Sequence, residues 1–305
     1  MSPIGGFGHD LALAFVGYLP AIAGAYISIL VLRYPDLTIE ASWSLAGIVA
    51  CLAAGSMPPL LAVTVGPLIG ALCGLVTAVV FHFTGRAKLL AGLISYWILE
   101  AVGFHVLGDS ASIYLSKHSR TGFGVSDSDA LSLAIYSGFA GIAFLALLGW
   151  QRSLWGRRAR LVGENPSASS FFRLSLDREF SLGLILSNAL VGFGGGLWAL
   201  YYGHASNLQG IGLVIKAFVA LLLGNEVLQV TGVVKRVAPA AVVVGTFLLV
   251  LLSVSTEMLQ VQVTTLIGWN WLRPTDKQIA VSLVLVTLLR ARRKKAIRES
   301  AVSEW

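Results

Sequence analysis

Acidic and hydroxyl side chains break up the apolar amino-terminal part of the chain at residues 34–42, which read YPDLTIEAS. Asp36, Thr38, Glu40 and Ser42 occupy alternate positions where the next helix is expected to start. Carboxylate and hydroxyl oxygens there can accept hydrogen bonds from free backbone N–H groups, and the two acids favour the positive end of the helix dipole. The pattern is typical of the discontinuous helices that line transport sites, and equally of a capped loop between two spans. Both interpretations stay open on the sequence alone.

Three more ionisable residues lie inside apolar segments: Glu100, Lys216 and Glu226. An acid at membrane depth costs about 3 kcal/mol or more, so Glu100 is expected to face the protein interior or a wet cavity. It could serve transport, or it could be a packed, hydrogen-bonded or protonated acid with a structural role. Lys216 and Glu226 are ten residues apart, nearly three helical turns, so they share roughly one helix face without touching. Each therefore needs its own partner or water.

The chain lacks the short motifs of the common enzyme classes. It contains no GxxxxGK[ST] phosphate loop, HExxH zinc motif, GxSxG nucleophile motif or CxxC pair. Asp127 and Asp129 lie in a serine-rich segment where solvated acids are the usual case, and Cys51 and Cys73 both lie within apolar runs. We therefore predict a protein that is not an enzyme, with no resident metal or cofactor and no ATPase site of its own.

The composition is that of a polytopic membrane protein. Of the 305 residues, 56% are hydrophobic and 12% are charged, and the mean hydropathy is +0.80. The formal net charge of +7 comes from basic residues that flank apolar runs, which indicates anchoring at the cytoplasmic membrane surface and argues against nucleic-acid binding. We predict an all-α fold of about eight to nine transmembrane or re-entrant helices.

The expected membrane segments follow one another across residues 1–305, which we predict to form a single transmembrane domain. The segment 211–223, with Lys216 inside it, is expected to be too short and too interrupted for an easy span. The segment 256–273 is expected to be re-entrant or interfacial and held by tryptophans. The basic tail, residues 290–305, is expected in the cytoplasm. Counting five spans back from residues 151–180, which are also expected there, places the amino terminus outside. The other spans are expected at residues 11–32, 41–57, 60–83, 89–107, 131–150, 181–202, 237–254 and 278–289.

The span 60–83 carries glycines at a spacing that leaves one helix face without side chains. Gly66, Gly70 and Gly74 recur every four residues, so a neighbouring backbone can approach closely along that face. This pattern predicts tight helix packing and says almost nothing about chemistry.

A polar segment of thirty residues, 151–180, separates two long apolar ones. It carries six arginines against three acids, and arginines in short loops resist translocation across a membrane. We predict that this segment is a cytoplasmic loop on which a partner docks.

Five stretches, in order along residues 11–290, resemble the permease subunits of ATP-binding-cassette (ABC) importers. The family is the one that includes branched-chain amino-acid and ribose permeases, and the branch is that of uncharacterised or aromatic amino-acid permeases. The stretches are YPDLTIEASWSLAGIVA at 34–50, RLVGENPSASSFF at 160–172, LSNALVGFGGGLWALYYG at 186–203, GIGLVIKAFVALLLGNE at 210–226 and LRPTDKQIAVSLVLV at 272–286.

The resemblance implies the rest of a transport machine in the lipid of a bacterial cytoplasmic (inner) membrane. Its parts are a second permease copy or a paralogue, two cytoplasmic ATPase subunits and an extracytoplasmic solute-binding protein. Ser169 and Arg173 depart from the small residues that the family usually has there, and Lys216 stands where the family is usually apolar. Lys216 could meet a carboxylate of the solute or a buried acid. The candidate coupling residues are Arg160, Gly163, Glu164, Asn165, Pro166 and Arg173, and the candidate pathway residues are Asp36, Thr38, Glu40, Glu100, Asn188, Lys216 and Glu226.

The sequence therefore predicts the permease subunit of an importer for a small polar organic solute. An amino acid is the preferred cargo, with nucleosides and sugars left open. ATP hydrolysis on a separate chain would move the loop around Glu164 and switch the spans between outward-open and inward-open states. The alternative is a proton-coupled secondary transporter that uses Glu100, Lys216 or Glu226, and an intramembrane enzyme is a more distant one.

Overall fold

The computed structural model describes residues 3–85, 87–108, 110–115, 129–167, 171–230 and 239–267, together with 279, 281–284, 286–287 and 290. The chain divides into two compact units, Ala12–Val214 in one and Met1–Leu11 with Ile215–Trp305 in the other. The described residues of both units are almost wholly helical.

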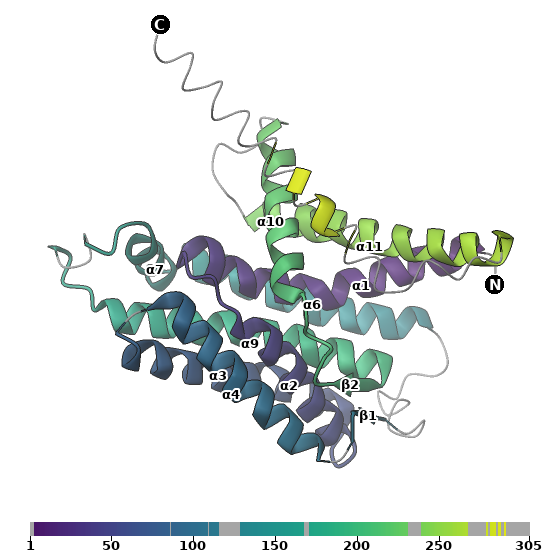
Figure 1. Ribbon diagram of the computed structural model, residues 1–305, viewed down its shortest axis with the longest axis horizontal. Coiled ribbons are helices and arrows are strands. Elements are labelled where there is room, and N and C mark those ends of the chain that lie inside the picture. The colour runs from purple at the N-terminus through teal and green to yellow at the C-terminus, as the bar shows by residue number, and fades with distance from the viewer. Residues whose placement is uncertain are drawn as a thin grey trace, which may run out of the picture. The chain divides into compact units, whose positions relative to one another are not determined.

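The larger unit is a helical bundle with the basic helix α7 at one end and the short strands β1 and β2 at the other (Figure 1). The first helix, α1, continues without interruption as a π-helix, η1. The elements are α1 (Pro3–Ala25), η1 (Tyr26–Val31), α2 (Thr38–Ala54), α3 (Pro59–Phe83), α4 (Lys88–Leu107), β1 (Ser112–Tyr114), α6 (Asp129–Arg152), α7 (Leu154–Glu164), α9 (Leu176–Tyr202) and β2 (His204–Ser206). The part of α1 up to Leu11 belongs to the smaller unit.

The centre of this unit is α9, and α3 runs antiparallel to it with backbone against backbone. A Cβ atom added at Gly66 would lie 2.7 Å from the carbonyl oxygen of Gly192, and one added at Gly74 would lie 2.5 Å from a carbonyl oxygen further down α9. At Gly70, which lies between these two glycines on α3, an added Cβ would run into the carbonyl oxygen of Asn188. The glycine face of α3 therefore lies directly on α9.

Two other helices, α1 and α2, also pack with their backbones close to α9. A Cβ at Gly194 would lie 2.8 Å from the carbonyl oxygen of Gly17 on α1, and one at Gly195 would run into the backbone of Trp43 on α2. The Ser187 hydroxyl donates to a carbonyl oxygen of α1 at 2.8 Å. As a result, 67% of the apolar window of α9 is buried, against 28% for α4.

Six of the described helices are long and apolar enough to cross a membrane, as predicted for a polytopic membrane protein. Helix α2, with 17 residues, is shorter than a full span. The six are Phe7–Val31, Leu61–Phe83, Lys88–Leu107, Leu133–Arg152, Leu176–Tyr202 and Pro239–Leu259.

The described fold is mostly helical, as predicted, and it also contains one short pair of strands. Strands β1 and β2 pair in antiparallel register, with Ser112 opposite Ser206 and Tyr114 opposite His204. Each strand has three residues, which is too short for the alternating pattern that marks a strand in a sequence.

The smaller unit contains α10 (Leu213–Val230), whose first two residues belong to the larger unit, and α11 (Pro239–Ile267). A Cβ at Gly224 would run into the Ala241 carbonyl of α11, so these two helices also meet through a glycine. The prediction of a separate interfacial segment from residue 256 is wrong up to Ile267, because α11 continues through it. No proline or glycine interrupts residues 246–267. The expected span 278–289 and tail 290–305 lie largely outside the described residues.

Candidate functional site

The first membrane span does not end as a regular α-helix. In the wide turns that close η1, the Leu32 N–H donates to the Ile27 carbonyl at 2.9 Å. The Tyr34 N–H donates to the Ser28 carbonyl at 2.8 Å. Arg33 between them has a left-handed conformation, with φ of 51°, which costs an L-residue roughly 1–2 kcal/mol. The chain reverses here and enters α2, which runs parallel to α9.

Lys88, the first residue of α4, holds the end of this turn. Its ammonium group donates to the carbonyl oxygens of Leu32 (3.3 Å) and Arg33 (3.0 Å). The same group lies 4.7 Å from the centre of the Phe180 ring, a favourable cation–π arrangement. A cation at the carbonyl end of a helix also complements the helix dipole. Lys88 thus fixes the point where the first span stops.

Asp36 is the centre of a buried polar network that joins the start of α2 to α3 and α9. One carboxylate oxygen accepts hydrogen bonds from the backbone N–H (3.0 Å) and the hydroxyl of Thr38. The other accepts from the Asn188 amide at 2.9 Å. The Ser42 hydroxyl donates to the Asn188 carbonyl oxygen (2.6 Å), and the Thr77 hydroxyl donates to the Thr38 hydroxyl (3.1 Å). All five side chains are fully buried.

The network lies beside the middle of α9 and not at its end. Asn188 is 12 residues after Leu176 and 14 before Tyr202, which is about 18 Å along the helix from its start. Helix α2 therefore begins at membrane depth. Three hydrogen bonds and the amino-terminal end of α2 offset the charge of the Asp36 carboxylate. This arrangement favours the discontinuous-helix interpretation over a capped loop between spans.

Glu40, about one helical turn after Asp36, binds backbone N–H groups at the start of α10. Its carboxylate oxygen accepts from the N–H groups of Gly212 (3.0 Å) and Val214 (3.2 Å), where α10 begins. The next turn of α2 contributes Ser44, whose hydroxyl accepts from the Gly210 N–H at 2.8 Å. Free N–H groups at a helix start need such acceptors, so α2 carries the connection that leads from β2 to α10.

Replacing Glu40 with alanine is expected to lower the free energy of unfolding by about 2 kcal/mol, because the two N–H groups lose an acceptor in a partly buried place. Glu40→Gln keeps an acceptor oxygen and loses only the charge, so its cost should stay below about 1 kcal/mol. Unfolding of both variants in mixed detergent micelles measures the difference. Equal costs would show that the charge, and not the hydrogen bonding, stabilises this contact.

Glu100 lies apart from this network and is half-buried. Its carboxylate accepts a hydrogen bond from the Tyr96 hydroxyl at 3.0 Å, one turn earlier on α4. Its backbone carbonyl accepts from the Asn207 amide at 2.9 Å, and Gly103 leaves the room that Asn207 occupies. Glu100 is thus a half-buried, hydrogen-bonded acid on α4.

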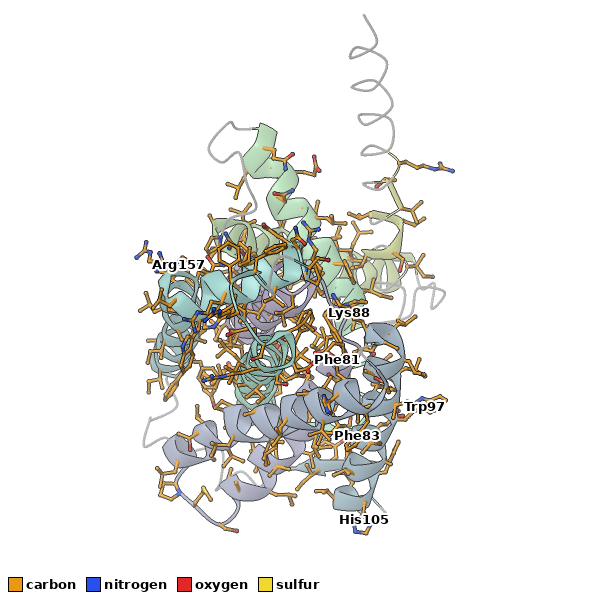
Figure 2. The ribbon with its side chains drawn as sticks, turned by 90° about the vertical axis from the view of Figure 1, so that its left-hand side faces the viewer. Phe81, Phe83, Lys88, Trp97, His105 and Arg157 are labelled. Carbon is orange, nitrogen blue, oxygen red and sulfur yellow. The ribbon has the colours of Figure 1, made fainter. Side chains whose placement is uncertain are left out.

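The segment predicted to dock a partner contains a helix, α7, with one face of small residues. Its start is capped by Ser153, whose hydroxyl accepts from the Gly156 N–H at 3.2 Å. Gly156, Ala159, Val162 and Gly163 are buried, while the arginines between them face outward, as Figure 2 shows for Arg157. The small residues recur at helical spacing, so this helix could have been predicted from the sequence.

Helix α7 packs against α6, α9 and η1. The Arg160 guanidinium donates to the Tyr26 hydroxyl at 3.3 Å. A Cβ atom at Gly163 would run into the Val31 carbonyl oxygen, so the two backbones are in direct contact there. The basic helix is therefore attached to the end of the first membrane span.

The other candidate residues of the loop are solvent-exposed. Glu164 ends α7, and Asn165 follows as its cap, with its N–H donating to the Leu161 carbonyl at 2.9 Å. Pro166 and Arg173 are also exposed, and Arg173 has a left-handed φ of 53°. This exposed end of α7 is available to a partner.

The structure thus brings Asp36, Thr38 and Asn188 together and leaves the other candidates elsewhere. Lys216 and Glu226 are half-buried on α10 and belong to the other unit. The sequence analysis identified Ser42 as an acceptor at the polar break but did not name it as a pathway residue, and it did not single out Thr77. Ser42 follows Thr38 by one helical turn, and Thr77 continues the glycine stripe of α3, so helical spacing could have indicated both.

Comparison with known proteins identifies the family. Residues 11–289 match the family described as branched-chain amino acid transport system / permease component. The chain is 24% identical over 227 residues to the tyrosine transport system permease protein of Clostridioides difficile (strain R20291), covering 74% of each chain. It is 29% identical over 206 residues to the autoinducer 2 import system permease protein LsrD of Enterobacter sp. (strain 638), covering 62% of this chain and 59% of that relative.

A solved ABC transporter of the metal-chelate type, in an inward-facing conformation, has a similar fold. The TM-score is 0.50 at 17% identity, with 94% of this chain and 85% of that chain covered. At this identity the likeness concerns the fold. Because the family match extends over nearly all of the chain, this protein belongs to the family of permease components of branched-chain amino acid transport systems.

Proposed function

We propose that this chain is the membrane-spanning subunit of an ABC importer for a small polar organic solute, with an amino acid as the preferred class, driven by a separate ATPase. Family membership supports the role in an importer. The relatives are named for tyrosine transport and autoinducer 2 import, and these names support a small polar cargo. Neither the family nor the relatives favour a proton-coupled secondary transporter.

The observation that carries the proposal is the geometry of α7. Its small-residue face is buried against membrane helices, and its arginines and the residues 164–166 are exposed at one end of the bundle. A helix of this kind can receive force from a soluble partner and pass it to the spans. The ATPase would contact Arg160, Glu164, Asn165, Pro166 and Arg173, with Gly163 holding α7 on the bundle.

The same proposal assigns the sides of the membrane. The chain would lie in the inner membrane of a bacterial cell. Helix α7 and the carboxy terminus would face the cytoplasm, and the amino terminus would lie on the outer side. The solute-binding protein would then dock at the opposite end, and a second permease copy or a paralogue would complete the pathway. Apolar side chains that point outward, such as Trp97 on α4 (Figure 2), would contact lipid.

Within the bundle, the proposal places the pathway near the polar break. Asp36, Thr38 and Asn188 lie at membrane depth on the discontinuous helix and on α9, as transport sites require. Glu40 holds the adjacent connection to α10. Glu100 lies about two turns further along α4 than Gly92, which faces the backbone of the break at Pro35 and Leu37.

The test is affinity purification of the tagged chain from its native membrane in mild detergent, with partners identified by mass spectrometry. An ATPase that carries the GxxxxGK[ST] motif should co-purify, and the double variant Glu164→Ala, Asn165→Ala should lower its yield at least fivefold. Tyr114→Ala, which removes a side chain 70% exposed at the other end of the bundle, serves as the control. Absence of an ATPase, together with proton-driven uptake by the chain alone in liposomes, would contradict the proposal. The role of Glu100, Lys216 and Glu226 would then need testing.

A further inference from the structure

Three elements connect α7 to the polar network in series: η1, the break at residues 32–37, and the first turn of α2. We propose that this series transmits the displacement of α7 to the start of α2, with Tyr26 and Lys88 as positioning residues. The inference rests on the proposed function, because it assumes that an ATPase moves α7. It adds the route by which that movement reaches membrane depth.

The first link is the contact between α7 and η1. At Gly163 the backbone of α7 touches the Val31 carbonyl, with no side chain between them. Closely packed backbones do not deform as flexible side chains do, so a shift of α7 passes into η1. The hydrogen bond from Arg160 to the Tyr26 hydroxyl joins the two elements a second time, at the other end of η1. Movement of α7 toward η1 and movement away from it are therefore both transmitted to η1.

The second link is η1 itself. A π-helix is rare and has poorer hydrogen bonds than an α-helix, and single π-turns are frequent at functional sites. Converting such a turn to α-helix shifts the register by one residue, which rotates the following chain by about 100°. Five of the six residues of η1 are buried, because α9 and α7 pack against it. A displacement of α7 therefore acts directly on the turns of η1.

The third link is the break, which is held at two points. Lys88 binds the carbonyl oxygens of Leu32 and Arg33, and Asn188 binds the Asp36 carboxylate three residues later. The same carboxylate accepts from the Thr38 N–H and so sets the direction in which α2 starts. A rotation of η1 against the fixed Lys88 contact must therefore appear as a change at Asp36.

The last link carries the movement across α2. Glu40 and Ser44 lie one and two turns beyond Asp36 and hold the backbone N–H groups of Gly210, Gly212 and Val214. A change in the direction of α2 moves these acceptors together. The expected response is thus a loosening or tightening of residues 210–214 when α7 moves.

The experiment uses the full complex of permease, ATPase and solute-binding protein, reconstituted in lipid vesicles. Tyr26→Phe removes only the hydroxyl, which contacts Arg160 and also Gln151 on α6. Lys88→Met keeps the apolar stem while removing both carbonyl contacts. Thr64→Val is the matched control, because it deletes one exposed hydroxyl on α3, away from α7. For each complex, ATPase yield, ATP hydrolysis and solute transported per ATP are measured.

We expect both variants to keep the ATPase bound and active. Tyr26→Phe should lower solute transported per ATP about fivefold, the effect of losing one moderate hydrogen bond. Lys88→Met should lower it at least as much, because it loses two carbonyl contacts. Hydrogen–deuterium exchange should show that the nucleotide-dependent change at residues 38–44 and 210–214 is reduced in both variants and retained in Thr64→Val. A transport ratio and an exchange pattern equal to those of Thr64→Val would overturn the relay. Failure of the unmodified chain to bind any ATPase would instead overturn the proposed function, so the two failures are distinguishable.

Discussion

Replacing Gly70 with alanine is expected to destabilise the bundle by about 3 kcal/mol, at the upper end of the range for overpacked cores. The added methyl group would run into the Asn188 carbonyl oxygen and would also approach the backbone of the following residue of α9. Both neighbours are backbone, which cannot move aside by changing a rotamer. Helices α3 and α9 must therefore separate, and the separation acts on Asn188, which binds Asp36. Unfolding in mixed micelles measures the loss.

Gly138→Ala on α6 is the matched control. No atom of the described residues lies within 4 Å of a Cβ placed there. Alanine has a higher helix propensity than glycine by about 1 kcal/mol, so this variant should be as stable as the unmodified chain or slightly more stable. If the two substitutions had the same effect, helix propensity and not backbone contact would account for the glycines of α3.

Asn188→Leu is expected to cost about 3–5 kcal/mol and to abolish solute transport, since it leaves the buried Asp36 carboxylate without its amide partner. It also removes the acceptor of the Ser42 hydroxyl. Thermal unfolding of the purified chain and uptake by the reconstituted complex give the two readouts. Both effects originate at membrane depth, about 18 Å from the α7 end of α9.

The double variant Asp36→Asn, Asn188→Asp tests whether the pair itself is responsible. An amide at position 36 can donate to a carboxylate at position 188, and its carbonyl oxygen can still accept from the Thr38 N–H. The exchanged pair should recover more than half of the stability lost in Asn188→Leu. If it recovers none, the side-chain shape at position 188, and not the hydrogen bond, is what the bundle needs.

Local patterns were enough to predict most of the helices and the chemistry of the polar break. The glycine spacing in α3 could be interpreted from that helix alone. The structure places Gly66, Gly70 and Gly74 against the backbone of α9. The capping of α2 by Asp36 is equally local, because donor and acceptor are two residues apart. Such contacts follow from period and capping rules alone.

Contacts between distant segments could not be predicted in this way. Asp36 and Asn188 were both singled out, but nothing in either local sequence says that they meet. The π-helical end of the first span packs against α7 and α9, and its apolar run YISILV gives no local signal for a π-helix. The prediction at residues 256–267 failed because polar residues were taken as a break, while an uninterrupted helix tolerates them.

The Asp36–Asn188 contact also bears on how the protein is made. The two residues are 152 positions apart, and at about 5–20 residues per second a ribosome needs about 8–30 s to synthesise that length. Helices α2 to α4 are completed during this interval, while the carboxylate lacks its amide and the glycine face of α3 lacks its neighbour. Insertion of α9 is therefore the step of biogenesis that converts a loose, degradation-prone nascent chain into a stable bundle.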